Sequence, residues 1–450
     1  MTTVLETCRI PPPPSAAAEL SLPLSYLDVT WVHFIPIRRL IFYDHPCSES
    51  EFLNTIVPQL KQSLSLTLKH YLPVAGNLLY PSDTARKPII RYVAGDSVPL
   101  TIAVSDNDFE HLTANYPRDA DQFYDYMPMI PPTTDGDECK VVPVFALQAT
   151  LFPSRGVVIG FANHHVLGDA SSIVGFVKAW AEINRLGGGS KSFSVENLPV
   201  FDRELINDPC GWDQVNWEVM REIPFTPPPS SFPIPTDRVR ATFTLNCTDL
   251  EKLKKTCPIQ ISSFVAATSY AWSCLAKSGD AVGEAAENGG MDCFSFVVEV
   301  RGRADPPVPA SYFGNCLSSA MVKVERRRLA GEEGFAVAAE EIGRVIRERV
   351  NRKEEVLRCM QNWPESFEIL KGIRAVGVSG SPKFDLGAAD FGWGEARKVE
   401  VLSIDGEKYS MSLSKSRGAG GGLEVGLSLE KKRMEAFVAI FAQGLANVSY

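Results

Sequence analysis

The feature of this sequence that most constrains its fold is a long irregular stretch at roughly 195–238. Three consecutive glycines precede it at 187–189, and prolines crowd its second part. These prolines are Pro224, Pro227, Pro228, Pro229, Pro233 and Pro235. Loops this long and this rich in proline usually connect domains rather than lie inside one. We therefore expect two domains, residues 1–194 and 239–450, joined by a crossover at 195–238.

Strand-like and helix-like patterns are mixed on both sides of this crossover. Before it, alternation predicts a strand around Val29–Tyr43, helical spacing predicts a helix at Glu51–Tyr71, and two β-rich runs occupy Val141–Ala162. Beyond it, the patterns predict helices at Ser262–Lys277, at about 333–360 and from Lys431, and strands at Cys293–Val300, Val399–Ile404, Tyr409–Leu413 and Leu423–Leu429. The predicted class is α/β, with two domains of similar size.

Composition excludes several classes of protein. The 450 residues are 45% hydrophobic and 22% charged, which is typical of a globular chain with a large core. The net charge of −9 argues against a nucleic-acid partner, which needs a basic face. Ten cysteines without a C-x-x-C pair or a Cys/His cluster argue against zinc and against a disulfide scaffold.

The same data predict where the protein works. Free cysteines suit a reducing compartment. The first twenty residues lack the apolar core of a secretory signal. The sequence also contains no run of about 18 apolar residues, which is the length needed to span a membrane. We therefore expect a cytoplasmic protein without a membrane partner.

One stretch carries the most chemical information. An apolar strand, Val157–Ala162, runs into His164 and His165, and Asp169 then begins a helix at Ala170–Ala181. A strand end facing a helix start holds a side chain rigidly, and a histidine there can take a proton near neutral pH. An aspartate in that position can cap the helix. Adjacent histidines point apart, so a metal site is not expected here.

Three ordered motifs make a family resemblance specific. The stretch H-H-x-x-x-D-A at His164–Ala170 and D-F-G-W-G at Asp390–Gly394 resemble the signatures of the plant BAHD acyltransferases, which use coenzyme A. Y-F-G-N-C at Tyr312–Cys316 is similar to the branch that acylates flavonoid and other phenolic glycosides. Further matches cover nearly the full length, at Leu22–Asp28, Tyr71–Gly76 and Leu413–Arg417.

The resemblance implies two chloramphenicol-acetyltransferase-like domains with a solvent channel between them. Acyl-CoA would enter from one face and the acceptor from the other, so that both meet at His165. As general base, His165 would deprotonate the acceptor hydroxyl, which attacks the thioester directly. No acyl-enzyme is implied, so Cys316 is not expected to be a nucleophile. The family suggests a monomer with acyl-CoA as co-substrate and no cofactor or metal.

The resemblance also assigns supporting residues. Asp169 would point away from the pocket and pair with an arginine, and Arg301 is the candidate because Glu299–Arg303 resembles D-x-R-x-R, with Glu in place of the first Asp. Asp390 is the third residue of the signature motifs, beside His165 and Asp169, and the resemblance implies a structural rather than a chemical role for it. It belongs with Gly392 and Trp393 to the motif that shapes the channel and the CoA site, and Asn315 is expected to be structural.

The sequence indicates the residues that would bind the acyl-CoA donor less specifically. Ser262 and Ser263 open a predicted helix whose N-terminus could bind a CoA phosphate, with Lys254 nearby. A serine cap and a solvated lysine pair explain these residues equally well. Hydroxycinnamoyl-transferring relatives place a tryptophan where this chain has Ser379 and Ser381, as malonyl-transferring relatives tend to have. Small polar residues suit a compact, charged acyl group.

These observations predict transfer of malonyl, or alternatively hydroxycinnamoyl, from CoA to a sugar hydroxyl of a phenolic or flavonoid glucoside such as an anthocyanin. Two alternatives stay open. One is acylation of another alcohol or an amine, because the motifs do not constrain the acceptor pocket. The other is a non-catalytic binding paralogue, which would be expected to carry a damaged base or channel motif.

Overall fold

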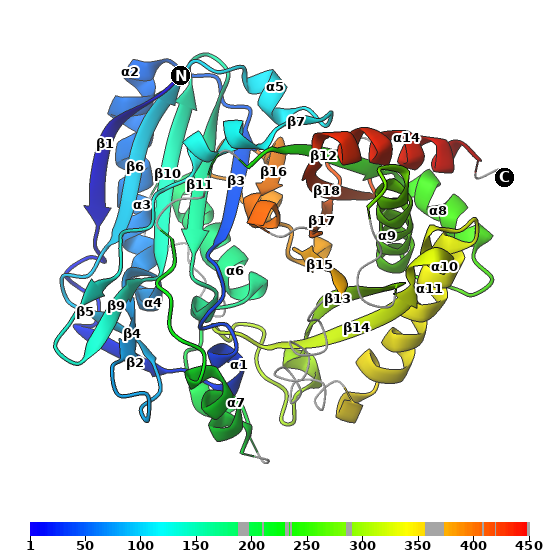
Figure 1. Ribbon diagram of the computed structural model, residues 1–450. Helices are drawn as coiled ribbons and strands as arrows, with labels where there is room; N and C mark the ends of the chain where they lie inside the picture. Colours follow the sequence, from blue (N-terminus) through cyan, green and yellow to red (C-terminus); the bar gives the residue numbers. More distant parts are fainter. Residues whose placement is uncertain are drawn as a thin grey trace.

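The structure is a computed structural model that describes residues 1–187, 198–208, 211–229, 234, 236–284, 290–355, 373–406, 409–418 and 420–447. Two sheet-and-helix halves lie side by side, the first blue to cyan and the second green to red in Figure 1. Parts of the predicted crossover and the end of the helix expected at about 333–360 lie outside the described residues.

The first half is built on a six-stranded sheet. Its strand order is β1 (Thr2–Ile10), β6 (Val98–Ser105), β10 (Phe145–Phe152), β11 (Gly156–Asn163), β3 (Ile37–Tyr43) and β16 (Lys398–Val401). The central strands β10 and β11 are buried along their whole length, because helices cover one face and an aromatic cluster covers the other. The covering helices are α3 (Val57–Leu68) and α6 (Ala170–Arg185), which pack against each other (Figure 1).

A smaller sheet extends this half. It has the order β2 (Glu19–Pro23), β5 (Ile89–Val93), β4 (Asn77–Pro81), β9 (Cys139–Pro143) and β8 (Thr134–Asp135). The short helices of this half are α1 (Tyr26–Val29), α2 (Glu49–Glu51), α4 (Leu72–Ala75) and α5 (Phe109–Thr113), and a π-helical turn, Phe52–Ile56, leads into α3.

The second half is built on a seven-stranded sheet. Its order is β14 (Leu317–Glu325), β13 (Met291–Glu299), β15 (Arg374–Ser379), β17 (Met411–Lys415), β18 (Leu423–Glu430), β12 (Arg238–Leu245) and β7 (Arg118–Asp119). Apolar side chains from this sheet and its helices form one core. The helices of this half are α8 (Cys247–Thr256), α9 (Ser263–Ala281), α10 (Arg326–Ala330), α11 (Gly334–Val345) and α14 (Lys431–Asn447), with a π-helical turn at Ile346–Val350. Helix α7 (Trp212–Arg221) packs against α1 of the first half.

Each half lends a strand to the other. Strand β16 comes from the C-terminal part of the chain but pairs with β3, and β7 comes from the N-terminal part but pairs with β12. Buried ion pairs connect the two exchanged strands, because Glu400 of β16 binds both Arg118 of β7 and Arg240 of β12. The two halves are therefore interlocked through their sheets as well as joined by the chain.

The structure confirms, within a few residues, the helices predicted at Glu51–Tyr71 and Ser262–Lys277 and the two β-rich runs. The strand predicted around Val29–Tyr43 is wrong in its first part, because the strand begins only at Ile37. The chain before it turns through α1, where Ser25 and Asp28 form a capping box that favours a helical turn.

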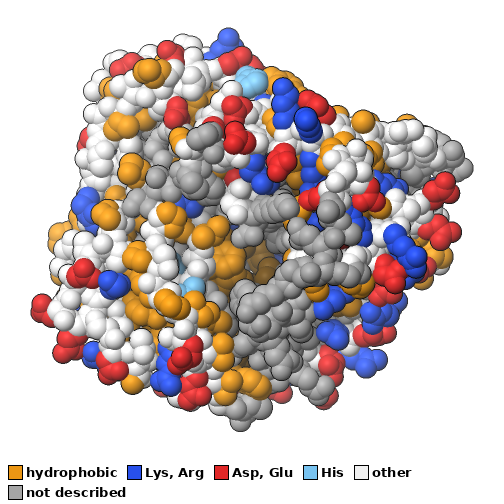
Figure 2. Space-filling view, viewed as in Figure 1, with side chains coloured by type: hydrophobic (Ala, Val, Ile, Leu, Met, Phe, Trp, Pro, Cys, Tyr) orange, Lys and Arg blue, Asp and Glu red, His pale blue; other side chains and the backbone are white. Residues whose placement is uncertain are grey.

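The surface between the halves is hollowed on the face shown in Figure 2, and hydrophobic side chains lie at the edge of the hollow. Within the described part of the chain, no helix combines the length and the apolar character that a bilayer crossing requires.

Candidate active site

His165 lies where the buried strand β11 gives way to helix α6. The side chain of His164 caps a short 3-10 turn, His165–Leu167, and Asp169 then caps α6. The imidazole of His165 stacks on the ring of Trp31, with centroids 3.8 Å apart and planes inclined by 10°. The ring of Phe34 meets the same imidazole edge-on at 5.5 Å. Local strand, cap and aromatic contacts therefore fix the ring in one orientation.

The side-chain amide of Asn315 fixes the tautomer of His165. Its Nδ2 donates to Asp28 Oδ1 and to the His165 carbonyl, each over 3.0 Å, so Oδ1 is the atom that faces the imidazole. The His165 Nδ1 to Asn315 Oδ1 distance is 3.1 Å, and an amide oxygen can only accept. Nδ1 must therefore carry the proton, which leaves the lone pair on Nε2.

The environment keeps this imidazole neutral. Burial lowers the pKa of His165 to about 4, and the positive charge of Arg39 acts in the same direction. A backbone hydrogen bond, the carboxylate of Asp169 and the hydrogen bond that His165 donates to Asn315 oppose this lowering without reversing it. A neutral imidazole with a free Nε2 lone pair at pH 7 can accept a proton from a substrate hydroxyl.

The neighbouring His164 has a different role. It is fully buried, and its Nδ1 accepts a hydrogen bond from the backbone N–H of Val166 over 3.3 Å. Burial lowers the pKa of His164 to about 3. This side chain shapes the turn that carries His165, and its buried position keeps it away from a substrate.

Asp169 and Arg301 form a buried bidentate ion pair. Arg301 Nη1 lies 2.7 Å from Asp169 Oδ2, and Nη2 lies 3.0 Å from Oδ1. Asp169 also accepts from the backbone N–H of Ser172 in α6 and of Cys316 in the opposite half. Glu299, which replaces the aspartate of the family pattern, accepts the backbone N–H of Arg301 over 2.7 Å. This network ties the histidine loop to the second half, and Asp169 makes no described hydrogen bond to the imidazole.

Asp28 is a functional-site residue that sequence reasoning missed. It is fully buried, and its Oδ1 accepts from the backbone N–H and the side chain of Asn315 over 2.9 and 3.0 Å. Its Oδ2 accepts from Ser25, and Arg203 Nε lies 3.5 Å away. The S-x-x-D spacing signals the cap, but nothing local indicates that the carboxylate also holds Asn315.

The D-F-G-W-G stretch forms a tight turn apart from the imidazole. Asp390 Oδ1 accepts from the backbone N–H groups of Gly392 and Gly394, each over 2.8 Å, and both glycines have positive φ angles of 96° and 85°. Phe391 packs edge-on against Trp180 of α6, and Trp393 stacks on His45. The motif thus anchors a loop from the second half of the chain on the first half.

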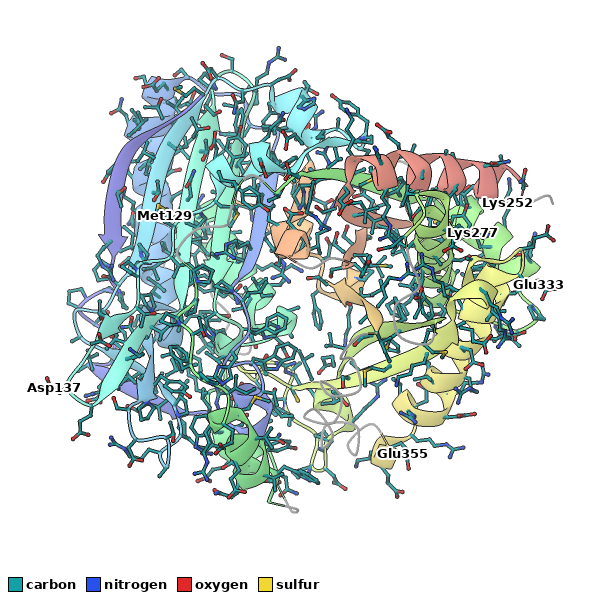
Figure 3. All side chains as sticks on the ribbon, viewed as in Figure 1. Met129, Asp137, Lys252, Lys277, Glu333 and Glu355 are labelled. Carbon is teal, nitrogen blue, oxygen red and sulfur yellow. The ribbon has the colours of Figure 1, made fainter. Side chains whose placement is uncertain are left out.

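The residues expected at the donor site lie on the second half. Ser262 Oγ accepts from the N–H of Val265 and so caps α9, and Lys254 pairs with Glu251 over 2.8 Å. Lys252 of the same basic stretch lies at the outer edge of this half (Figure 3). Ser263 follows the cap as the first residue of α9. These contacts are those of a helix cap and a surface ion pair, and the phosphate-binding role stays a prediction.

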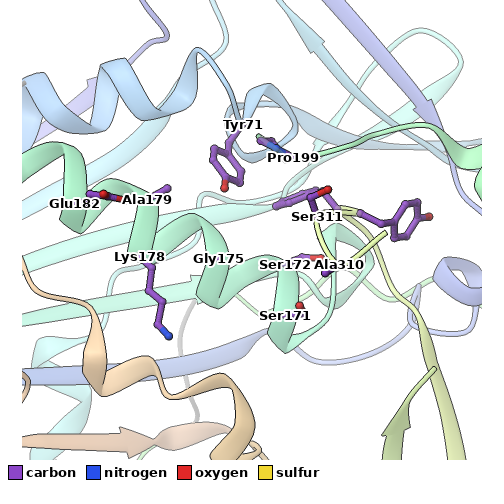
Figure 4. A pocket seen from close by; sticks show the side chains of 12 residues that line it. Tyr71, Ser171, Ser172, Gly175, Lys178, Ala179, Glu182, Pro199, Ala310 and Ser311 are labelled. Atoms are coloured by element: carbon purple, nitrogen blue, oxygen red, sulfur yellow. The ribbon is translucent and has the colours of Figure 1, made fainter. Parts of the chain in front are cut away.

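Two cavities adjoin α6. The larger, about 470 Å³, lies between α6 and the segment that carries Ser311, with Lys178 and Tyr71 among its lining residues (Figure 4). His165 is not among the residues that line it. The smaller, about 60 Å³, lies at the start of α6 and is lined by Arg39, Ala170 and Ser381. Ser379, at the end of β15, does not line either of these two cavities.

The Cys316 thiol near Asp169 is not ionised. Burial raises the pKa of the Cys316 thiol to about 12, so this side chain stays protonated. Within the described ranges, no group of three or more His, Cys, Asp or Glu residues could hold a metal ion.

Two interlocked sheet-and-helix halves with a neutral histidine at a strand end define a two-domain acyltransferase. The sequence matches the Transferase family over residues 1–443, and the chain belongs to this family, the BAHD acyltransferases that use coenzyme A. The fold agrees with the solved structure of vinorine synthase, with a TM-score of 0.70 and 19% identity over 97% of this chain and 96% of that one.

Two relatives are closely similar in sequence. A malonyl-coenzyme:anthocyanin 5-O-glucoside-6'''-O-malonyltransferase of Salvia splendens is 56% identical, over 100% of this chain and 96% of its own length. A phenolic glucoside malonyltransferase of Nicotiana tabacum is 42% identical, over 99% of this chain and 100% of its own length.

Proposed function

We propose that this acyltransferase moves a malonyl group from malonyl-CoA to a sugar hydroxyl of an anthocyanin or another phenolic glucoside, with His165 as general base. The observation that carries the proposal is the hydrogen bond between His165 Nδ1 and Asn315 Oδ1, which leaves the Nε2 lone pair free. The names of the two close relatives support the choice of donor and acceptor.

The reaction runs in one displacement. His165 Nε2 takes the proton of the sugar hydroxyl while its oxygen attacks the thioester carbonyl. The tetrahedral oxyanion collapses, the C–S bond breaks, and the proton passes from the imidazolium to the CoA thiolate. A positioned base contributes roughly 10²–10⁴ in rate, and alignment of the two substrates and oxyanion stabilisation supply the rest.

The other predicted residues have supporting roles in this proposal. Asp169 and Arg301 hold the histidine loop against the second half, and Asn315 orients the base. Asp390, Gly392 and Trp393 shape the channel and the CoA site by anchoring their loop. Ser262, Ser263 and Lys254 are proposed to meet the CoA phosphates at the N-terminus of α9.

The proposal includes a monomeric, cytoplasmic enzyme that needs acyl-CoA as co-substrate and no cofactor. The cysteines recorded for the described residues are free thiols, which suits a reducing compartment.

The test follows free thiol release and the mass of the product. Purified protein with malonyl-CoA and a panel of anthocyanin and phenolic glucosides is expected to gain one malonyl group on a sugar. His165→Ala is expected to lower kcat/KM by about 10²–10⁴. His111→Ala is the matched control, because the described hydrogen bonds of the His111 ring are to the nearby Tyr116 and Gln122, and this change should leave the rate unchanged.

Two results would contradict the proposal. Turnover with coumaroyl-CoA and none with malonyl-CoA would contradict the assignment of malonyl-CoA as the donor. Full activity of the His165→Ala protein would contradict the assignment of His165 as the general base.

A further inference from the structure

Arg39 is a buried cation whose neighbours on the same strand are core residues. In β3 it alternates with Ile41 and Tyr43, which belong to the core under α6, so its side chain lies on the α6 face of the sheet. It is only 8% exposed and lines the small cavity with Ala170 and Ser381. In the register of β11 against β3, Arg39 lies opposite Phe161, four residues before His165. Its positive charge acts to lower the pKa of that imidazole.

Arg39 has no partner among the described residues, whereas the other cations around the cavity have one. Arg397 pairs with Glu110, Lys398 with Glu424, and Arg417 with Asp385. The adjacent Arg38, on the opposite face of β3, donates to the carbonyls of Pro36 and Pro229.

An unpaired buried guanidinium is costly, so it marks a place where an anion is expected. Burying a charge without a partner costs several kcal/mol in proteins. Burial lowers the pKa of Arg39 to about 10, which still leaves the group charged at pH 7. Helix α6 begins at Ala170 in the same cavity wall and adds the positive end of its dipole. Asp169 caps the start of α6, but no described carboxylate pairs with Arg39 in this cavity wall.

We propose that Arg39 binds the free carboxylate of a dicarboxylic acyl group and thereby selects malonyl-CoA over neutral acyl-CoA donors. The inference rests on the proposed function, because it assigns the malonyl subsite of that same reaction. The malonyl carboxylate is separated by one CH₂ from the thioester carbon that is attacked, so its binding group must lie near His165. A guanidinium can hold a carboxylate through two parallel hydrogen bonds. The small size of the cavity, about 60 Å³ against about 470 Å³ for its neighbour, suits such a group better than an aromatic ring.

The experiment compares malonyl-CoA with acetyl-CoA, which differs only by the carboxylate. We expect Arg39→Gln to lower the ratio of kcat/KM for malonyl-CoA to that for acetyl-CoA by about 10²-fold or more, because a site built for a polar group rejects the analogue that lacks it. Arg39→Lys keeps the positive charge but lacks the planar guanidinium that can hold a carboxylate through two hydrogen bonds. Its ratio should lie between that of the unchanged protein and that of Arg39→Gln.

Two further readouts separate recognition from structure. Since the Arg39 charge has no partner among the residues that the structure describes, Arg39→Gln is expected to keep or raise the Tm without substrate. Loss of that charge is also expected to raise the pKa of His165, so the acid limb of kcat/KM for acetyl-CoA should move to higher pH. Arg38→Gln is the matched control, because it removes a buried arginine of the same strand and should leave the donor ratio unchanged.

The outcomes distinguish this inference from the proposed function. If the unchanged protein shows no preference for malonyl-CoA, the donor assignment fails. If it prefers malonyl-CoA and Arg39→Gln keeps that preference, Arg39 is not the subsite. An equal loss with both donors, accompanied by a lower Tm, would show that Arg39 is structural and would overturn the inference.

Discussion

At the residue scale, two side chains from distant parts of the chain set the tautomer of the His165 imidazole. Asp28 holds the amide of Asn315, and Asn315 in turn accepts from Nδ1 of His165. The orientation of the Asn315 amide matters, because a flipped amide would place Asn315 Nδ2 against His165 Nδ1 and favour the proton on His165 Nε2. Asp28 is thus a positioning residue that acts on the imidazole through Asn315.

We expect Asn315→Ala to lower kcat/KM by about 10–10²-fold, because loss of the partner that orients a functional histidine typically costs this much. The free energy of unfolding should also fall by about 1–3 kcal/mol, because Asp28 loses a buried hydrogen-bond donor. Steady-state kinetics and urea unfolding measure the two effects. If stability falls while kcat/KM stays at the original value, the amide holds the loop and does not control the tautomer.

At the element scale, the exchanged strand β16 joins the two halves through charge. Glu400 Oε1 accepts from Arg118 over 2.9 Å and Oε2 accepts from Arg240 over 3.0 Å. Burial by itself would raise the pKa of Glu400, but attraction to Arg118 and Arg240 outweighs it and holds the pKa at about 2. This carboxylate is therefore ionised at every pH at which the protein is expected to be folded.

Removing the buried charge of Glu400 should weaken the contact of strand β16 with strands β7 and β12. We expect Glu400→Gln to lower the free energy of unfolding by about 3–5 kcal/mol, because the buried guanidinium of Arg118 loses its carboxylate and Arg240 keeps that of Asp405. Glu348→Gln is the control, since its pair with Arg344 is exposed on one helical stretch and is worth about 0.3–0.5 kcal/mol. Equal losses for the two variants in urea unfolding would show that β16 is not held by this network.

At the scale of the whole molecule, the neutral imidazoles of His164 and His165 link stability to pH. The pKa is lowered to about 3 for His164 and to about 4 for His165, whereas a histidine of the unfolded chain titrates near 6.5. Between these values the unfolded chain binds protons that the folded protein does not. The stability that depends on these two groups is therefore present above about pH 6.5 and is lost as the pH falls.

We expect the free energy of unfolding to fall between pH 7 and pH 5, with a slope that approaches about 1.4 kcal/mol per pH unit for each imidazole. Urea unfolding at pH 7, 6 and 5 measures this slope. His165→Ala should make it shallower, because one of the titrating groups is removed. A free energy of unfolding that is constant over this interval would contradict the burial of neutral imidazoles.

Short-range patterns account for what the sequence determined by itself. The apolar run of β11, the paired histidines and the capping aspartate indicated a reactive turn, because strand alternation, helix periodicity and caps depend on residues a few positions apart. The motifs at 164–170, 312–316 and 390–394 indicated the family, and the comparisons confirm it. The pairing of Asp169 with Arg301 was expected from the same resemblance.

Only the tertiary structure decided which distant groups meet. Asp28, Asn315 and His165 converge because three separate elements pack together, and strand β16 joins the first sheet through pairing across more than 350 positions. The strand expected to begin near Val29 begins only at Ile37, after the α1 turn in which Asp28 meets both Ser25 and Asn315. Burial and partners are properties of long-range packing that local periodicity does not encode. They decide that Arg39 has no partner within the described part of the chain and that His165 is neutral.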